Sequence, residues 1–185
     1  MKNKAKTYIE LILIAGFVIL ADQWSKQLIT KTLALGESFA PIPAIGNFFR
    51  IVHWRNTGVA FGLFQGSGWI FTIVGVGIVI LIILFYKQVS DGPAAWRIAL
   101  GLQLGGAIGN MIDRITRGYV VDFLWFGKFP VFNIADSAIV IGAAILIIYM
   151  WIDEKKAGSG QQTTVSEEKP QEEQHDERNK NSINL

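Results

Sequence analysis

Long apolar stretches alternate with polar segments along the chain, and four of these stretches have the length of membrane-crossing helices. They cover residues 8–28, 69–86, 94–112 and 135–152. The second is the clearest, because it holds no charged residue and a helix of about 20 residues crosses a bilayer core of roughly 30 Å. The third is less apolar, since it contains Arg97, Gln103 and Asn110. We therefore predict an all-α membrane protein with four transmembrane helices.

The first and third stretches carry further signals. The first follows a lysine-rich lead, as in a signal peptide, but it lacks a small-residue cleavage site and continues into a polar helical segment. We predict that it is an uncleaved span. In the third stretch, glycines 101, 105 and 109 recur every four residues and share one helix face. Such small residues let helices pack closely in lipid.

Two polar segments differ from the spans. The loop 30–68 is too long for a simple connection, and its segment Phe48–Trp54 is aromatic and β-branched, which predicts a strand. We expect a small sheet or flap on the membrane surface. After Ile152 the chain becomes rich in Gln, Glu, Ser and Lys. We predict a membrane domain over 1–152 and a disordered polar tail over 153–185.

Composition agrees with this division and excludes several chemistries. Hydrophobic residues make up 51% of the chain and charged residues 17%, a balance that favours a bilayer. The net charge of +2 argues against nucleic acid as a partner. The chain has no cysteine, which excludes disulfides, a thiol nucleophile and cysteine-bound metal. Its two histidines lie far apart in sequence, so we predict no metal site.

Two aspartates near one end of the spans are the main candidates for chemistry. Asp122 stands among valines and aromatic residues, and Asp136 begins the fourth span. The segment between them is short enough to fold back and bring the two carboxyl groups together. Two carboxylates that share a site hold one proton between them, which is the arrangement an aspartyl hydrolase uses.

Structural interpretations of the charged residues are also open. Asp136 could be a helix N-cap, and Asp122 could be a loop residue at the water interface. Asp22 and Lys26 stand four apart and favour a structural ion pair. The remaining charges near this end could be ordinary interfacial residues, namely Asp113 and Arg114.

Other classes of protein also use such residues. Membrane carboxylates serve as proton relays in transporters, although a relay needs acids at several depths and here they cluster towards one face. A non-enzymatic scaffold would use the polar tail as its binding element. Loop charges only weakly favour cytoplasmic termini, and four spans put both termini on one side.

Four motifs in order resemble the lipoprotein signal peptidase family, signal peptidase II. Each is weak alone, but their order within a four-span frame is specific. They are Asp22-Gln-Trp-Ser-Lys26, Asn56-Thr-Gly-Val-Ala-Phe-Gly62, Gly106-Ala-Ile-Gly-Asn-Met-Ile-Asp-Arg114 with Gly118-Tyr-Val-Val-Asp-Phe123, and Phe132-Asn-Ile-Ala-Asp-Ser137.

The resemblance implies an aspartyl endopeptidase of the bacterial cytoplasmic (inner) membrane that needs no metal or cofactor. Such enzymes remove the signal peptide of a prolipoprotein just before a diacylglyceryl-modified cysteine. The implied partners are membrane lipids and these prolipoproteins, not nucleic acid, and we expect a monomer.

The resemblance also assigns positions. It places the catalytic pair at Asp122 and Asp136 near the outer face, with both termini and the tail cytoplasmic. The loop after the first span resembles an extracytoplasmic β-cradle. Residues implied to support the site or bind substrate are Asp22, Lys26, Asn56, Asn110, Arg114, Asn133 and Ala135.

Overall fold

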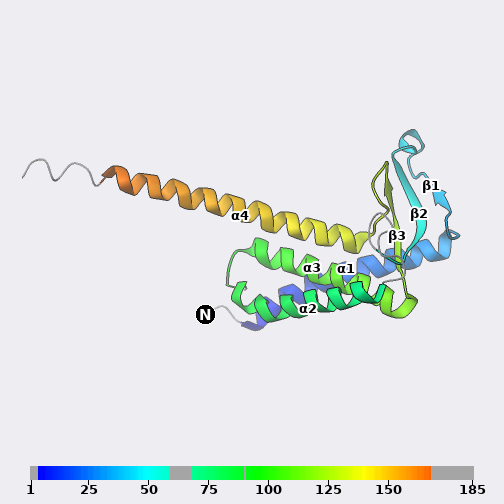
Figure 1. Ribbon diagram of the computed structural model, residues 1–185, viewed down its shortest axis with the longest axis horizontal. Helices are drawn as coiled ribbons and strands as arrows, with labels where there is room; N and C mark the ends of the chain where they lie inside the picture. Colours follow the sequence, from blue (N-terminus) through cyan, green and yellow to red (C-terminus); the bar gives the residue numbers. More distant parts are fainter. Residues whose placement is uncertain (1–3, 59–67, 90, 168–185) are drawn as a thin grey trace, which may run out of the picture. The chain divides into compact units, whose positions relative to one another are not determined.

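A computed structural model describes residues 4–58, 68–89 and 91–167. Its elements are, in order, α1 (Lys4–Thr32), β1 (Ser38–Phe39), the 3-10 helix η1 (Pro43–Ile45), β2 (Phe49–Asn56), α2 (Gly68–Val89), α3 (Ala94–Arg117), β3 (Val120–Phe126) and α4 (Ile134–Glu167) (Figure 1). The chain forms two compact units, Met1–Leu146 and Ile147–Leu185. Every residue of the candidate site belongs to the first.

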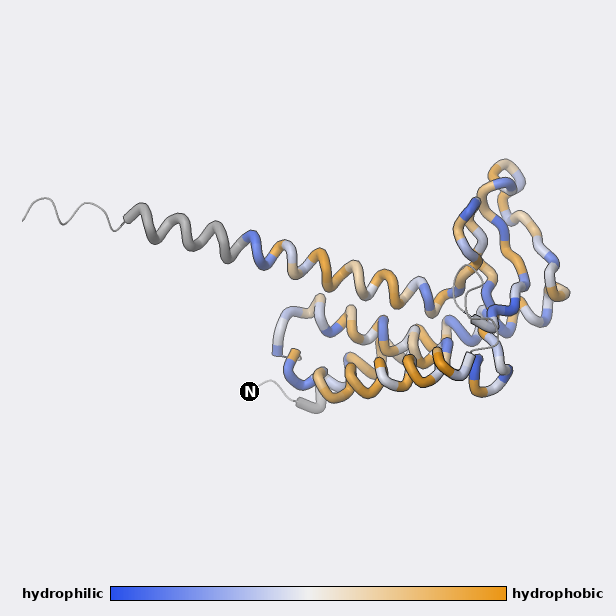
Figure 2. Tube along the Cα trace, in the orientation of Figure 1, coloured by the Kyte–Doolittle hydropathy of each residue, from blue (hydrophilic) through white to orange (hydrophobic). Residues whose placement is uncertain are grey.

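Three helices are confirmed as long and apolar enough to cross a membrane, within the described part of the chain. They are Tyr8–Thr32, Gly68–Val89 and Ile134–Lys155. Large side chains such as Phe17 on α1 and Leu84 on α2 face outward, and Figure 2 shows α2 as largely hydrophobic along its length. A surface of this kind suits contact with lipid tails rather than water.

Helix α3 is the exception, since its polar side chains keep it below the apolar content of the other three. It packs against α1 and α2, and many of its residues are buried. A helix covered by its neighbours needs fewer lipid-facing residues, which explains why α3 is the least apolar of the four predicted spans.

Close packing between α1 and α3 depends on the predicted glycine face, which is confirmed. A Cβ atom at Gly105 would lie 2.8 Å from the carbonyl oxygen of Ala15, and one at Gly109 would lie 2.7 Å from Asp22 Oδ2. On the neighbouring face of α3, Gly106 contacts the carbonyl oxygen of Ala135 at the start of α4. Glycine therefore brings three helices to van der Waals distance beside the candidate site.

The sheet joins two loops that lie far apart in sequence. Its order is β1-β2-β3, and both pairings are antiparallel. The predicted strand at 48–54 is confirmed as β2. The alternative that Asp122 is a loop residue is wrong, because it lies in β3 opposite Trp54. The valine and aromatic residues of β3 favour a strand on propensity alone.

Two helices, α1 and α4, extend beyond the spans predicted for them. Helix α1 runs to Thr32 and α4 to Glu167, so the first part of the predicted tail is helical; it contains Lys, Glu and Gln and lacks proline, which favours continuation of the helix. Residues 168–185 lie outside the described residues, and disorder there stays a prediction. Residues 59–67, which include the end of the Asn56–Gly62 motif, lie outside them as well.

Candidate active site

Asp122 lies in β3 and is almost completely buried, with 1% of its surface exposed. Both of its carboxylate oxygens accept hydrogen bonds from amide side chains. Asn56 Nδ2 on β2 donates to Oδ2 at 2.9 Å, and Asn133 Nδ2 donates to Oδ1 at 2.7 Å. Leu124 and Phe132 form a β-bridge that folds the chain back after β3, which brings Asn133 beside Asp122.

Asp136 occupies the first turn of α4 and is half-buried. Its backbone N–H donates to Asn133 Oδ1 at 2.9 Å, and the Asn133 N–H donates to Asp136 Oδ2 at 3.3 Å. This reciprocal pair is a capping box in which Asn133, not Asp136, is the N-cap residue. The N-cap interpretation of Asp136 is therefore wrong. Its remaining oxygen, Oδ1, accepts a hydrogen bond from Asn110 Nδ2 at 2.7 Å.

Two asparagines connect the aspartates. Asn133 Nδ2 donates to Asn110 Oδ1 at 3.1 Å as well as to Asp122, and the same Asn110 oxygen accepts from Lys26 Nζ at 3.1 Å. With its oxygen held by two donors, the Asn110 amide must turn its NH₂ group towards Asp136. The two carboxyl groups therefore belong to one continuous hydrogen-bond network, linked through Asn110 and Asn133.

A buried ionic cluster adjoins this network. Lys26 Nζ lies 2.8 Å from Asp22 Oδ2 and 3.0 Å from Asp113 Oδ2, and all three side chains are fully buried. Gln23 Nε2 donates to both carboxylates, at 3.1 Å and 3.3 Å. The interpretation of Asp113 as an ordinary interfacial charge is wrong, because α1 and β3 cover it.

Burial also changes the acidity of Asp122. Removal from water raises its pKa to about 7, and the nearby charge of Asp136 acts in the same direction. The hydrogen bonds from Asn56 and Asn133 oppose this rise. A carboxyl group with this pKa still holds a proton near neutral pH, as one member of an acid–base pair must.

The remaining predicted residues lie around the network. The buried Ala135 donates its N–H to Asp22 Oδ1 at 3.0 Å. Arg114 Nη1 reaches the Asn110 carbonyl oxygen at 3.4 Å, and its guanidinium lies over the ring of Phe71. Sequence reasoning missed Gln23 and Asp113 as parts of the site, although both lie within the motifs that carry the resemblance.

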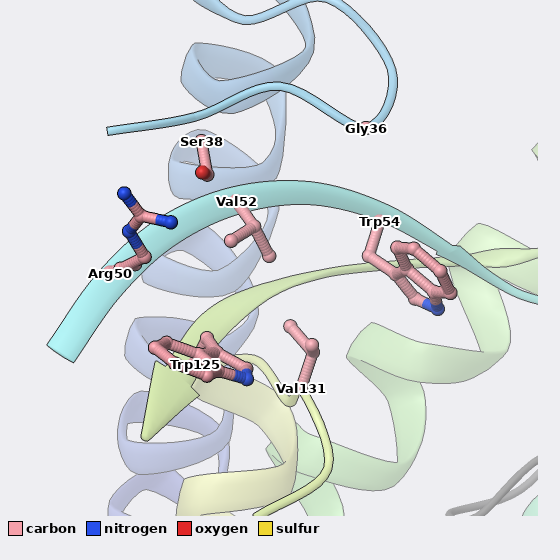
Figure 3. Close-up of a pocket in the computed structure, with 7 residues that line it drawn as sticks. All are labelled: Gly36, Ser38, Arg50, Val52, Trp54, Trp125 and Val131. Carbon is pink, nitrogen blue, oxygen red and sulfur yellow. The ribbon is translucent and has the colours of Figure 1, made fainter. Parts of the chain in front are cut away.

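A cavity of about 340 Å³ lies on the sheet (Figure 3). Arg50, Val52 and Trp54 of β2 line it, and Trp125 of β3 closes one side. None of the network residues described above lines it, although Trp54 pairs with Asp122 across the two strands.

Comparisons with known proteins agree with the motifs. Residues 14–152 match the family Signal peptidase (SPase) II. A lipoprotein signal peptidase of Anoxybacillus flavithermus is 43% identical over 148 residues, which cover 78% of this chain and 86% of that protein. The lipoprotein signal peptidase of Bacillus subtilis (strain 168) is 41% identical over 148 residues, covering 78% of this chain and 94% of that one.

A solved structure also resembles the fold. A bacterial membrane enzyme determined by the in meso method at 2.3 Å resolution superposes with a TM-score of 0.72 at 38% identity, covering 79% of this chain and 90% of that chain. Sequence and fold thus point to the same relatives, and the chain belongs to the signal peptidase II family.

Proposed function

We propose that the chain is an aspartyl endopeptidase that removes signal peptides from diacylglyceryl-modified prolipoproteins, cutting just before the modified cysteine. Family membership supports the substrate class. The observation that carries the mechanism is the network in which Asn110 and Asn133 link the carboxyl groups of Asp122 and Asp136. Such a pair performs acid–base hydrolysis with its own side chains.

The chemistry divides between the two aspartates. Asp122 carries the shared proton and donates a hydrogen bond to the scissile carbonyl oxygen, which makes the carbonyl carbon more electrophilic. Asp136 is the ionised member and takes a proton from water as the water oxygen attacks that carbon. Collapse of the tetrahedral intermediate breaks the C–N bond, and the leaving nitrogen receives the proton that Asp136 gained. Both carboxyl groups then return to their starting states.

The sheet supports four spans rather than three. Strand β2 precedes α2 and β3 follows α3, yet the two strands pair directly. The segment between α1 and α2, which contains β2, and the segment between α3 and α4, which contains β3, must therefore lie on one side of the bilayer. If α2 crosses, a return crossing by α3 fits this pairing, and it supports a position of the sheet and both aspartates at one face. We assign this face to the outside, with both termini cytoplasmic.

The absence of cysteine makes this topology easy to test. Single cysteines would be introduced at Glu37 and Thr116 on the proposed outer side, and at Asp91 and Lys155 on the inner side. A membrane-impermeant thiol reagent added to intact cells should label the first two and spare the others. Labelling of Asp91→Cys from outside would contradict the four-span arrangement.

A cleavage assay tests the substrate class. Purified protein in detergent would receive one prolipoprotein in two forms, with and without the diacylglyceryl group on its cysteine. We expect cleavage of the modified form alone, with the modified cysteine as the new N-terminus by mass spectrometry. A metal chelator should leave the rate unchanged, because the carboxyl pair activates the water. Equal cleavage of both forms, or a cut elsewhere, would contradict the proposal.

A further inference from the structure

The ionic cluster of Asp22, Lys26 and Asp113 has no part in the reaction described above. Its three side chains are fully buried, and Lys26 bridges the two carboxylates. Burial of charges is costly in free energy, and ion pairing often fails to offset it. A cluster of this kind therefore needs a reason beyond the stability of the fold.

The hydrogen bonds of the two carboxylates supply that reason. Asp113 Oδ2 accepts the backbone N–H of Val121 at 3.1 Å, and Val121 directly precedes Asp122. Asp22 Oδ1 accepts the backbone N–H of Ala135 at 3.0 Å, and Ala135 directly precedes Asp136. Each supporting carboxylate thus holds the backbone N–H of the residue that precedes one aspartate of the pair.

We propose that Asp22, Lys26 and Asp113 are positioning residues that set the separation of the two catalytic carboxyl groups. This inference rests on the proposed function for its catalytic consequence. Lys26 on α1 pairs with both Asp22 and Asp113. The positions of the β3 backbone and of the start of α4 therefore both depend on this one cation. A shift of either support would move one member of the pair relative to the other.

Lys26 acts on the pair by a second route. Its Nζ donates to Asn110 Oδ1 at 3.1 Å, which fixes the orientation of the amide that donates to Asp136 Oδ1. A neutral side chain at position 26 would leave that amide with only Asn133 to hold its oxygen. The positioning unit therefore controls the backbone beside Asp136 and one hydrogen bond to its side chain.

A second ion pair between the same helices provides a matched control. Arg97 Nε on α3 pairs with Glu10 Oε2 on α1 at 2.8 Å, and Arg97 also donates to the carbonyl oxygen of Gly92. Neither of these contacts involves the backbone of β3 or α4. Glu10→Gln removes a charge from the α1–α3 interface without touching the proposed supports.

The experiment compares Asp113→Leu, Asp22→Leu and Glu10→Gln in the full-length protein in detergent. Cleavage of a diacylglyceryl-modified prolipoprotein gives kcat and KM, and hydrogen exchange with mass spectrometry follows the Val121 and Ala135 amides. We expect kcat of both leucine variants to fall on the order of 10²-fold, as for a displacement of about 1 Å. KM should stay at the wild-type value, and Glu10→Gln should match wild type in both constants.

Hydrogen exchange should distinguish the loss of one positioning contact from a general loosening of the fold. Asp113→Leu should speed exchange at Val121 and leave Ala135 protected, and Asp22→Leu should do the reverse. Asp113→Asn, which keeps one acceptor oxygen, should recover part of kcat. If the leucine variants do not fold, Asp113→Asn and Asp22→Asn carry the test by the same readouts.

Three results would overturn the inference: wild-type kcat in the folded variants, a loss confined to KM, or equal acceleration of exchange at both amides. An inactive wild type would instead refute the proposed function. The exchange pattern would still decide whether each carboxylate holds its own peptide group, so the two failures are distinguishable.

Discussion

Two ion pairs join α1 to α3, and they differ in burial. Glu10 and Arg97 pair at 2.8 Å with side chains that are 41% and 16% exposed. Lys26 and Asp113 pair at 3.0 Å with side chains that are fully buried. Partly exposed pairs contribute roughly 0–1 kcal/mol because water screens them. Buried pairs carry a desolvation cost, and removal of one partner strands the other charge.

The difference shows where the bundle is specialised. We expect the Glu10–Arg97 end to lose its charges with little consequence. At the other end, the same two helices hold a buried cation between two carboxylates, and both carboxylates reach the backbone beside Asp122 and Asp136. We interpret the buried end as part of the machinery and the other end as ordinary packing.

Lys26→Met should have the largest effect. It removes the cation that Asp22 and Asp113 share and leaves Asp113 only Arg117 Nη1 at 3.8 Å, so we expect a loss of about 3–5 kcal/mol in the free energy of unfolding. Chemical unfolding in detergent measures this loss, and cleavage should fall with it. A stability equal to that of Glu10→Gln would remove the distinction between the two ends.

A triple variant sharpens this prediction. Replacing all three charges together, as Asp22→Leu, Lys26→Met and Asp113→Leu, leaves no unpaired charge among the three residues, and well-packed apolar groups often restore stability. We expect the triple variant to be more stable than Lys26→Met alone and still poorly active. Recovery of full activity would show that the cluster serves folding only.

Gly109→Ala should come next. Its Cβ would lie 2.7 Å from Asp22 Oδ2 and 3.4 Å from the Ala135 Cβ, so the buried Asp22 carboxylate must shift, and α1 with it if the side chain has no room. Overpacking of this kind costs about 1–3 kcal/mol, measurable as a lower thermal midpoint. Gly75→Ala on α2 is the matched control, since a Cβ there meets no atom within 4 Å. Equal midpoints for the two variants would contradict the close packing at the site.

Asn56→Ala should move the pH dependence of cleavage. With the pKa of Asp122 at about 7, the shared proton is lost as pH rises through this value, so the rate should fall on the alkaline side. The Asn56 hydrogen bond lowers this pKa, and its removal should shift the descending limb to higher pH. Rate profiles of both proteins measure apparent pKa values of the coupled pair. A shift to lower pH would contradict this role of Asn56.

Glu10→Gln should have the smallest effect. This pair is only partly buried and makes no contact with the backbone beside the aspartates, so we expect a change within about 1 kcal/mol in stability and wild-type cleavage. Thermal unfolding and the cleavage assay check both. A large loss of activity would extend the functional region to the Glu10–Arg97 end.

Local and periodic features of the sequence predicted much of the fold. Apolar stretches located all four helices, and glycine spacing predicted the face of α3 that packs on α1. The motifs also indicated that Asp122 and Asp136 belong together, and the shared network agrees. Each of these features depends on residues close in sequence or on a family pattern.

Contacts between distant segments could not be predicted in this way. β3 forms because β2, more than 60 positions earlier in the sequence, offers a strand edge. Asp113 is buried because Lys26 and β3 cover it from other elements. Neither partner is visible from the residues around Asp113, so its charge alone suggested an interface position.

Single-turnover cleavage by wild type, Asp122→Asn and Asp136→Asn tests the central claim most directly. Asparagine keeps the size of each side chain but cannot exchange the proton that the mechanism requires. We expect each variant to cleave a diacylglyceryl-modified prolipoprotein about 10²–10⁴-fold more slowly than wild type. A wild-type rate in either variant would contradict the assignment of the pair.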